Sequence, residues 1–463
     1  MINYNTNIEN LKKYKHIHMI GIGGVSMSGI AEILHNWGIF VTGSDSTRSK
    51  ITDRLSSHGI FVSIGHETNL VKKADLVVYS AAIKQDDPEL TEARDNGITT
   101  IERADFVGYI TRIYKDTVGI AGTHGKTTTT SMVSLCFIEA GLDPTIQVGA
   151  NLKQINGNYR VGNSDYFILE SCEYVESFLK FSPKSSIVLN IDNDHLDYFK
   201  NLDNIIKAFQ KYVAILPYDG LLVVNADDPN CMELRNHTEA RSVTFGIECE
   251  KANYVARNIV FDDRGFAKFD VYHNNTYFSE MKLSVPGIHN VLNALSCIAL
   301  CTEYGINKYD IKSALLKFTG ANRRFELVGS YQNIDIYDDY AHHPSEILAT
   351  YNSLKNKKYR QSWIIFQPHT YSRTKNLLDD FAQILTKFDN VIVTDIYAAR
   401  EKNTYGISSK DLVDKIHSLG KTAVYISSFD DIAKFVRERA CPHDIILTVG
   451  AGTITELGKK ILN

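Results

Sequence analysis

The sequence predicts an α/β protein with three domains, and three observations lead to that prediction. Short apolar runs alternate with stretches of helical periodicity along the chain, which is typical of parallel sheets covered by helices. Glycine-rich turns follow two of the apolar runs and open helical stretches. The length of 463 residues, at about 150 residues per domain, corresponds to three domains.

Residues 1–115 are predicted to form an N-terminal Rossmann-like domain. The apolar run 16–20 is a strand candidate, and a glycine turn with a helical stretch over about 27–36 follows it. Further strand candidates between helical patterns lie at 39–45, 74–80 and 97–103.

Residues 116–324 are predicted to form a central domain of P-loop ATPase type. A strand, a glycine turn and a helix running to about residue 140 recur at its start. The stretch 241–283 alternates short β-prone runs with turns, which predicts added antiparallel strands. A helix over about 289–303, closed by Gly305, follows. The other strand candidates of this domain are 166–170, 186–191 and 221–227.

Residues 325–463 are predicted to form a C-terminal Rossmann-like domain. Its apolar runs again alternate with helical patterns, and no low-complexity linker separates it from the central domain. The strand candidates are 334–339, 362–367, 390–395, 422–426 and 444–450.

The composition argues against several classes of protein. Fifty Lys and Arg against 54 Asp and Glu give a net charge of −4, which does not indicate a nucleic-acid partner. No apolar stretch approaches the roughly 18 residues of a membrane span, so we expect a cytoplasmic protein without a membrane partner. The seven cysteines form no CxxC pair, which speaks against a disulfide framework or a thiolate zinc site. A monomer and a homodimer are both compatible with the sequence.

The first glycine turn predicts an anion site in the N-terminal domain. Backbone N–H groups at Gly23, Gly24 and Ser26, at the start of a helix, favour a phosphate. Asp45 ends the next strand, where a ribose hydroxyl could be held. These four residues are therefore predicted to bind a nucleotide-type substrate, although Ser26 replaces the third glycine of GxGxxG. A tight turn without a ligand is the alternative.

The second glycine turn predicts a nucleoside triphosphate site. Lys126 would place its charge at the β- and γ-phosphates, and the Thr127 hydroxyl would bind Mg²⁺. A strict Walker A motif needs glycine at position 120, where this chain has Ile120. The predicted phosphate-binding residues are Gly122, Thr123, His124, Gly125, Lys126, Thr127 and Thr128.

Polar residues after two later strands predict the rest of a metal site. Glu170 ends one strand, and His195 follows the next within an acidic cluster. Both strand ends would face the phosphate loop in a parallel sheet, so Thr127, Glu170 and His195 are the predicted metal ligands. For their neighbours Glu173, Asp192 and Asp197, helix capping or solvation is an equal alternative.

The last third of the chain contributes further candidates. Asn290 opens a helix and could contact an adenine edge or act as an N-cap. Arg324 offers a guanidinium suited to phosphate, with a solvated surface arginine as the alternative. Titratable groups also cluster after two strands of the C-terminal domain, at Asp339, His342, His343, His369 and Arg373.

Taken together, these motifs resemble those of Mur ligases in the same order along nearly the whole chain. The pair DDYAHHP and FQPHTYSRT favours the branch that joins L-alanine to UDP-N-acetylmuramate with ATP in peptidoglycan precursor synthesis. The motifs are GIGGVSMSGIAE (21–32), GTHGKTTTT (122–130), LNIDNDHLDYF (189–199), NADDP (225–229), PGIHNVLNA (286–294), NRRFE (322–326), DDYAHHPSEI (338–347), FQPHTYSRT (366–374) and GAGTITELG (450–458).

The resemblance implies roles for individual residues. The segment 122–128 would bind the ATP phosphates, and Glu170 and His195 would hold Mg²⁺, with Mn²⁺ as an alternative. Lys126 and Arg324 would neutralise charge during phosphoryl transfer. Further ATP contacts would come from Asn290, Arg324 and Asp339. The sugar-nucleotide and the amino acid would be contacted by His342, His343, His369 and Arg373. Either His342 or His343 would be the general base.

Two departures from the family pattern accompany this hypothesis, Ser26 in the first glycine turn and a second within 170–175, and two alternatives stand beside it. Many Mur ligases read EADESD where this chain has ESCEYV (170–175), so that Cys172 replaces an acid. A ligase that attaches a tripeptide to UDP-N-acetylmuramate would share the same ATP site. An NAD-binding oxidoreductase is the alternative from another class, but it has no use for the GKTT phosphate loop.

Overall fold

The computed structural model describes residues 11–355, 357–399 and 401–463 and confirms the three-domain α/β architecture, with one sheet at the centre of each domain. By its contacts the chain separates into two compact units. The first unit comprises the chain up to Val255 together with Ser296–Ser313. The second comprises Ala256–Leu295 and Ala314–Asn463. The domain boundaries at 115/116 and 324/325 remain predictions.

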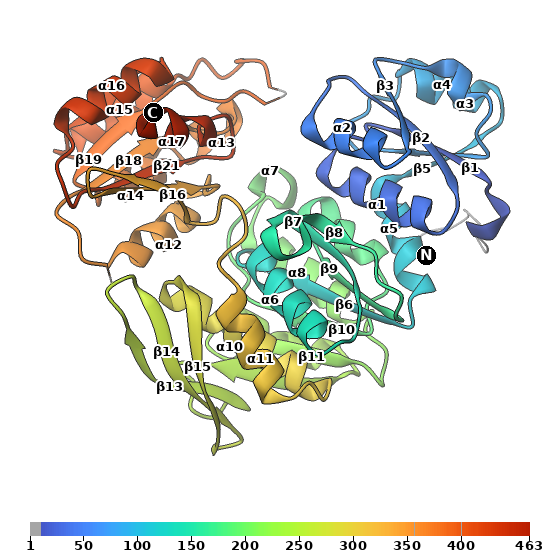
Figure 1. Ribbon diagram of the computed structural model, residues 1–463, viewed down its shortest axis with the longest axis horizontal. Helices are drawn as coiled ribbons and strands as arrows, with labels where there is room; N and C mark the ends of the chain where they lie inside the picture. The colour runs from blue at the N-terminus through green and yellow to red at the C-terminus, as the bar shows by residue number, and fades with distance from the viewer. Residues whose placement is uncertain (1–10, 356, 400) are drawn as a thin grey trace. The chain divides into compact units, whose positions relative to one another are not determined.

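The N-terminal sheet has five strands, all parallel, in the order β3-β2-β1-β4-β5. Its strands alternate with helices, as predicted (Figure 1). Strand β3 is missing from the prediction, because it is a short edge strand whose Phe61 and Ile64 are more than half exposed. The elements are η1 (Leu11–Lys13), β1 (His16–Ile20), α1 (Val25–Asn36), β2 (Phe40–Asp45), α2 (Lys50–Ser57), β3 (Phe61–Ile64), α3 (Thr68–Val71), β4 (Leu76–Tyr79), α4 (Pro88–Asp95), β5 (Thr99–Glu102) and α5 (Arg103–Ile113).

In the first unit, the central sheet has the strand order β12-β11-β10-β6-β9-β7-β8. All of these strands run parallel except β8, which pairs antiparallel with β7 in a hairpin that the sequence did not reveal. The elements are β6 (Asp116–Ala121), α6 (Lys126–Glu139), β7 (Thr145–Leu152), η2 (Lys153–Ile155), β8 (Gly157–Arg160), β9 (Tyr166–Glu170), η3 (Tyr174–Lys180), β10 (Ser185–Val188), α7 (Leu196–Phe199), α8 (Leu202–Val213), β11 (Leu221–Asn225), α9 (Pro229–Glu233), η4 (Leu234–His237) and β12 (Arg241–Gly246).

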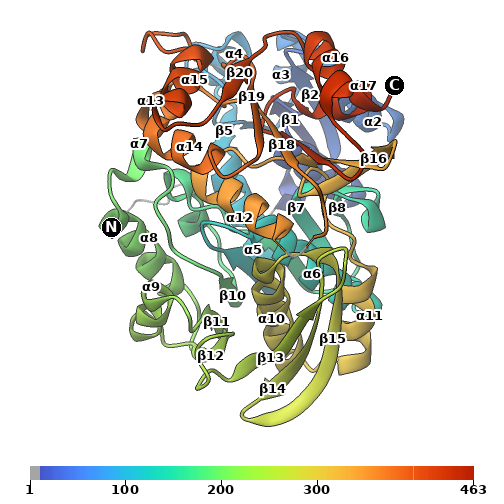
Figure 2. The same ribbon diagram turned by 90° about the vertical axis from the view of Figure 1, so that its left-hand side faces the viewer.

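The stretch 241–283 contains strands of both orientations. Strand β12 pairs in parallel with β11, and β13 (Tyr254–Phe261) begins in parallel with β12. Strands β14 (Phe266–His273) and β15 (Thr276–Pro286) form an antiparallel pair, as predicted, in a long curved ribbon of the second unit (Figure 2). The expectation of antiparallel strands throughout this stretch was therefore wrong for β12, because turn signals do not reveal strand direction.

The C-terminal sheet has the order β16-β17-β21-β18-β19-β20, with five parallel strands and an antiparallel edge strand, β16. The five parallel strands match the predicted ones. The remaining elements of the chain are α10 (Ile288–Glu303), α11 (Lys308–Lys317), β16 (Glu326–Tyr331), β17 (Ile334–Asp339), α12 (Pro344–Leu354), β18 (Ser362–Phe366), α13 (Tyr371–Asn376), α14 (Leu378–Leu385), β19 (Asn390–Val393), α15 (Ser409–Ser418), β20 (Ala423–Tyr425), α16 (Phe429–Arg439), β21 (Ile445–Val449) and α17 (Thr455–Leu462).

Helix α6 is rich in threonine and serine, yet it is largely buried. Two of its hydroxyls are satisfied within the helix, because Thr130 Oγ1 donates to the Lys126 carbonyl and Ser131 Oγ donates to the Thr127 carbonyl, at 2.8 and 2.7 Å. The helix can therefore enter the core with polar side chains. None of the helices in the described residues is both long and apolar enough to cross a membrane.

Replacement of Gly108 by alanine is expected to destabilise the protein. Helix α5 packs backbone to backbone on η3 at this residue, where a Cβ atom would overlap the Lys180 carbonyl oxygen. Overpacking of this kind costs about 1–3 kcal/mol, so the melting temperature should fall. Gly458→Ala in α17 is the control, because its Cβ would lie no closer than 3.3 Å to Val328. Equal thermal stability of the two variants would contradict this account of the packing.

Candidate active site

The loop 122–125 connects β6 to α6 and depends on two glycines. Gly122 and Gly125 have φ angles of 138° and 85°, a region that other residues rarely adopt. A Cβ atom on Gly122 would also lie only 3.0 Å from the Cβ atom of Leu189. The loop therefore lies close to the segment after β10, and its backbone leads into the N-terminus of α6, where an anion is favoured.

Asn190 holds this loop in its shape. Its Oδ1 accepts a hydrogen bond from the His124 N–H at 2.7 Å, and its Nδ2 donates to the His124 carbonyl at 3.1 Å. The Asn190 carbonyl accepts from the Thr123 N–H at 3.0 Å. On the other side, the Thr123 hydroxyl accepts from the Asp192 N–H at 2.9 Å. Asn190 is thus a positioning residue that sequence reasoning left without a role.

Lys126 makes a buried ion pair at the start of α6. Its Nζ donates to both carboxylate oxygens of Glu173, at 3.0 and 2.9 Å, and to the carbonyls of Gly122 and Thr123. The two side chains are only 15% and 2% exposed. Burial by itself would lower the pKa of Lys126, but the Glu173 carboxylate raises it above its usual value. The lysine is therefore a fixed cation, and Glu173 holds the place at which an anionic ligand would meet it.

Glu170 is held at the end of β9 by the backbone of β7. Its Oε1 accepts a hydrogen bond from the Gly149 N–H at 2.7 Å, and a Cβ atom on residue 149 would lie 2.6 Å from Oε2. Glycine at position 149 therefore permits this contact. The sequence did not indicate that Gly149 has any bearing on the site.

His195 lies after β10 in a left-handed conformation, with φ of 52°. Its ring lies 4.5 Å from the ring of Tyr174, measured between centroids, and its Nε2 is 3.8 Å from Asp194 Oδ2. A non-glycine residue in this region often marks a functional position. Of its acidic neighbours, Asp192 contacts His124 at 3.4 Å, whereas the side chain of Asp197 lies outside the described residues.

The topology explains why these residues share one edge of the sheet. Strands β10, β6 and β9 are neighbours and run parallel, so their carboxyl ends face the same way. The phosphate loop with Lys126, Thr127 and Thr128, the Glu170 segment and the His195 segment all leave the sheet from these ends. Sites in open parallel sheets lie at this edge.

The first glycine turn is occupied by internal hydrogen bonds. Asp45 Oδ2 accepts from the Gly23 N–H at 2.9 Å, and a Cβ atom on Gly23 would lie 2.8 Å from that oxygen. Asp45 therefore supports the turn, while its predicted contact with a ribose is untested. Gly24 precedes the first residue of α1 as its N-cap.

Ser26 accepts hydrogen bonds from two side chains that the sequence did not connect with it. Its Oγ accepts from Arg103 Nη1 at 3.3 Å and from Gln147 Nε2 at 2.6 Å. Arg103 is the first residue of α5, and Gln147 lies on β7. A guanidinium thus lies beside the first turn of α1, which strengthens the prediction of an anion site there.

In the second unit, Asp339 ends β17 and is buried. Its Oδ2 accepts from Thr350 Oγ1 at 2.6 Å and its Oδ1 from the Ala341 N–H at 3.1 Å. Burial raises its pKa to about 6, although Thr350 and Arg324 oppose the shift. Arg324 Nη1 lies 3.6 Å from Glu346 Oε1, and its guanidinium lies 5.5 Å from the centre of the Tyr340 ring.

The structure brings His342, His369 and Arg373 together. The two histidine rings lie 5.7 Å apart, and Arg373 Nη1 is 3.1 Å from His369 Nδ1. Burial lowers the pKa of His369 to about 4, assisted by His342 and Arg373. His369 also stacks on Tyr397, at 5.8 Å between ring centroids. These side chains follow β17, β18 and β19, all strands of the C-terminal sheet.

Two predicted residues have local structural partners. His343 is the N-cap of α12, and its Nδ1 accepts from the Ser345 N–H at 3.4 Å. Asn290 lies in the first turn of α10, where its Nδ2 donates to the Pro286 carbonyl at 2.7 Å and its Oδ1 accepts from Asn293. These contacts do not test the predicted ligand roles of either residue.

Family models and relatives agree with this arrangement. The Mur ligase family catalytic domain matches residues 16–115, the Mur ligase middle domain 120–301 and the Mur ligase glutamate ligase domain 323–452. The UDP-N-acetylmuramate–L-alanine ligase of Acetivibrio thermocellus is 48% identical over 97% of this chain and 96% of its own. The chain belongs to the Mur ligase family.

Other Mur ligases are similar over their full length. The UDP-N-acetylmuramate–L-alanine ligase of Caldanaerobacter subterraneus is 47% identical over 98% of both chains. The crystal structure of UDP-N-acetylmuramate–alanine ligase MurC from Thermotoga maritima superimposes with a TM-score of 0.82, at 31% identity over 97% of this chain and 98% of that one. The murein peptide ligase Mpl of Psychrobacter arcticus gives 0.72, at 25% identity over the same shares of the two chains.

Membership of this ATP-dependent ligase family removes the NAD-binding oxidoreductase alternative. It also calls for a divalent cation, and the side chains here fit one. The Thr127 hydroxyl and the Glu170 carboxylate are hard oxygen donors of the kind that Mg²⁺ prefers. Glu173, the residue after the departure at Cys172, supplies the carboxylate that meets Lys126.

Lys126→Ala is expected to reduce the rate of ADP formation at least 100-fold, as loss of a group that stabilises charge in the transition state does. It would also leave Glu173 buried without its partner, so thermal stability should fall with activity. Lys115→Ala is the matched control, because Lys115 is 80% exposed and pairs with Asp165 at the surface. Full activity of Lys126→Ala would contradict the phosphate role.

Proposed function

We propose that this Mur ligase joins L-alanine to the lactyl carboxylate of UDP-N-acetylmuramate, with cleavage of ATP to ADP and phosphate, in peptidoglycan precursor synthesis. The observation that carries the proposal is the buried Lys126 in a glycine loop, paired with Glu173, in a chain 48% identical over nearly its whole length to an L-alanine ligase. The structural match to an alanine ligase, with a TM-score of 0.82, supports the same substrate class.

The three domains would have separate duties in this reaction. Residues 1–115 would bind the UDP-sugar through Gly23, Gly24, Ser26 and Arg103. Residues 116–324 would bind ATP through the phosphate loop. Residues 325–463 would contribute Asp339 and the histidine and arginine cluster, with Arg324 at the boundary. The predicted contacts of Asn290 with ATP and of Asp45 with the sugar nucleotide belong to this proposal.

The reaction needs activation because a carboxylate is a poor acceptor for an amine. Its leaving group would be oxide, whereas phosphorylation by ATP gives an acyl phosphate that the amine can attack with release of phosphate. Lys126 and Arg324 would neutralise the charge that develops during phosphoryl transfer. Mg²⁺, or Mn²⁺ in its place, would be held by Thr127, Glu170 and His195 and would supply further positive charge at the phosphates.

The hydrogen bonds favour His342 over His343 as the proton acceptor. His342 Nδ1 faces the Tyr340 carbonyl at 2.9 Å, which can only accept, so Nδ1 carries the proton and Nε2 has a lone pair. His343 Nδ1 is instead engaged as the N-cap of α12, 3.4 Å from the Ser345 nitrogen and 2.7 Å from Ser345 Oγ. Burial, helped by Arg373, lowers the pKa of His342 and keeps its ring neutral at pH 7. His342 would therefore take a proton from the alanine ammonium.

A tripeptide-adding ligase is the remaining alternative within the family, since structures of such ligases also match, at 25% and 27% identity. The higher identity of the L-alanine ligases favours alanine. We place the reaction in the cytoplasm, in accord with the sequence, and propose no nucleic-acid or membrane partner. We propose that the enzyme is a monomer or a homodimer.

Amine-dependent ADP release tests the proposal directly. The full chain is assayed with ATP, Mg²⁺ and UDP-N-acetylmuramate, and with L-alanine, glycine, L-serine or L-alanyl-γ-D-glutamyl-diaminopimelate in turn. We expect the highest kcat/KM with L-alanine and no release without an amine. A preference for the tripeptide would assign the chain to the alternative, and the absence of amine-dependent ADP release with all four would refute ligation.

The pH profile distinguishes the two histidines. Because the pKa of His342 is lowered from 6.5, its neutral form persists below that pH, and the acid limb of kcat/KM should lie below pH 6.5. His342→Gln should lower kcat/KM by about 10² or more and remove this limb. His343→Asn, which keeps an N-cap side chain, should retain both the activity and the limb. The reverse pattern would identify His343 as the base.

A further inference from the structure

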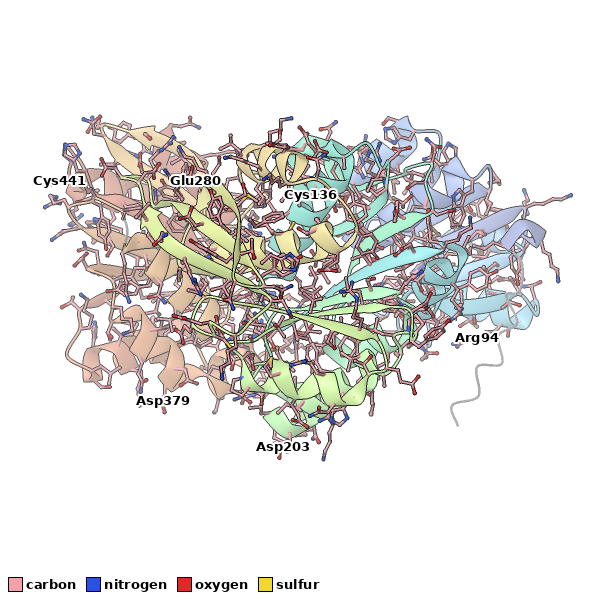
Figure 3. The ribbon with its side chains drawn as sticks, turned by 90° about the horizontal axis from the view of Figure 1, so that it is seen from below. Arg94, Cys136, Asp203, Glu280, Asp379 and Cys441 are labelled. Atoms are coloured by element: carbon pink, nitrogen blue, oxygen red, sulfur yellow. The ribbon has the colours of Figure 1, made fainter. Side chains whose placement is uncertain are left out.

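Three cysteines far apart in the sequence meet in the first unit. Cys136 lies near the end of α6 (Figure 3), and Cys297 and Cys301 lie one turn apart on α10. The Sγ atoms of Cys136 and Cys297 are 3.6 Å apart, and those of Cys297 and Cys301 are 3.9 Å apart. All three sulfur atoms lie within 4.8 Å of one another. The sequence, with no CxxC pair, did not predict this cluster.

These separations suit a metal ion bound by three sulfur atoms. With metal–sulfur bonds of about 2.3 Å, as in zinc thiolate sites, sulfur atoms lie about 3.8 Å apart in tetrahedral and about 4.0 Å apart in trigonal geometry. The two measured distances, 3.6 and 3.9 Å, lie close to this range. The i, i+4 spacing of Cys297 and Cys301 places both thiols on one face of α10.

The donor atoms and the buried, apolar environment of the three cysteines indicate which class of ion would bind. Each of the three cysteines has no exposed surface, and the residues around them on α10, such as Ile298 and Leu300, are buried and apolar. The group contains sulfur donors only, without carboxylate or imidazole. Hard cations such as Mg²⁺ prefer oxygen, whereas thiolates select soft or borderline ions such as Cu⁺ and Zn²⁺.

We infer that Cys136, Cys297 and Cys301 form a binding site for one thiophilic cation of the Zn²⁺ or Cu⁺ class, separate from the Mg²⁺ site of the ligase reaction. The ion would form three metal–sulfur bonds and displace the thiol protons to solvent, without oxidation of sulfur. The ion would link α6 to α10. Because α6 begins at Lys126, this link would fix the helix that follows the phosphate loop.

Cadmium is a suitable probe, because its thiolate complexes absorb in the ultraviolet. The full chain, reduced and stripped with a chelator, is titrated with Cd²⁺ against a chromophoric competitor. Because the sulfur atoms are buried, a second sample is refolded from denaturant with Cd²⁺ present. We expect one tightly bound Cd²⁺ per chain, an environment of three sulfur atoms by X-ray absorption, and a higher melting temperature.

Cys301→Ala and Cys136→Ala should each weaken Cd²⁺ binding at least tenfold. Cys231→Ala is the matched control, since Cys231 is equally buried in the same unit but lies outside the cluster. If the first two variants do not fold, the number of sulfur ligands that X-ray absorption finds around Cd²⁺ in the wild-type chain still tests the inference. Absence of a stoichiometric Cd²⁺ ion from both wild-type samples, fewer than three sulfur ligands, or equal binding by Cys301→Ala and Cys231→Ala would overturn the inference.

Discussion

The ion pair between Lys126 and Glu173 is the interaction on which the ATP half of the site depends. Both side chains are nearly buried, and the lysine also binds the carbonyls of Gly122 and Thr123. Removal of one partner from a buried pair costs about 3–5 kcal/mol, because the other charge is left without compensation. The pair therefore keeps a positive charge at the start of α6 and holds the loop ready for an anion. A triphosphate would replace one carboxylate with several phosphate oxygens around the same ammonium group.

In all three sheets the candidate site residues follow the carboxyl ends of parallel strands. Parallel strands end at one edge, where the loops can approach one another. Close approach needs small residues, so Gly23 lies against Asp45, Gly122 against Leu189 and Gly149 against Glu170. In each of these three places a Cβ atom would push away a side chain or a backbone segment. The glycines thus determine the distances within the sites as well as the turns.

Some of the site could be predicted from sequence because its chemistry is local. A strand, a glycine turn and Lys126 follow one another within a few residues, so the phosphate loop is visible in the chain itself. Glu173, Arg103 and Gln147 could not be assigned this way, because their partners lie far away in sequence. The Gly149 contact with Glu170 and the Asn190 contact with the loop have the same origin. Each depends on which strands are neighbours.

The sequence by itself determined the alternation of strands and helices, the position of both glycine turns, and the strands of the three sheets apart from the β7–β8 hairpin, the edge strands β3 and β16, and the individual strands within 241–283. Local hydrophobic periodicity and backbone conformational preference are enough for these features. Only the tertiary structure decided which polar groups meet: that Lys126 pairs with Glu173, that His342 Nδ1 faces the Tyr340 carbonyl while His343 caps a helix, and that three scattered cysteines converge. Such contacts arise from strand order and helix packing, which bring together residues that no spacing in the chain connects.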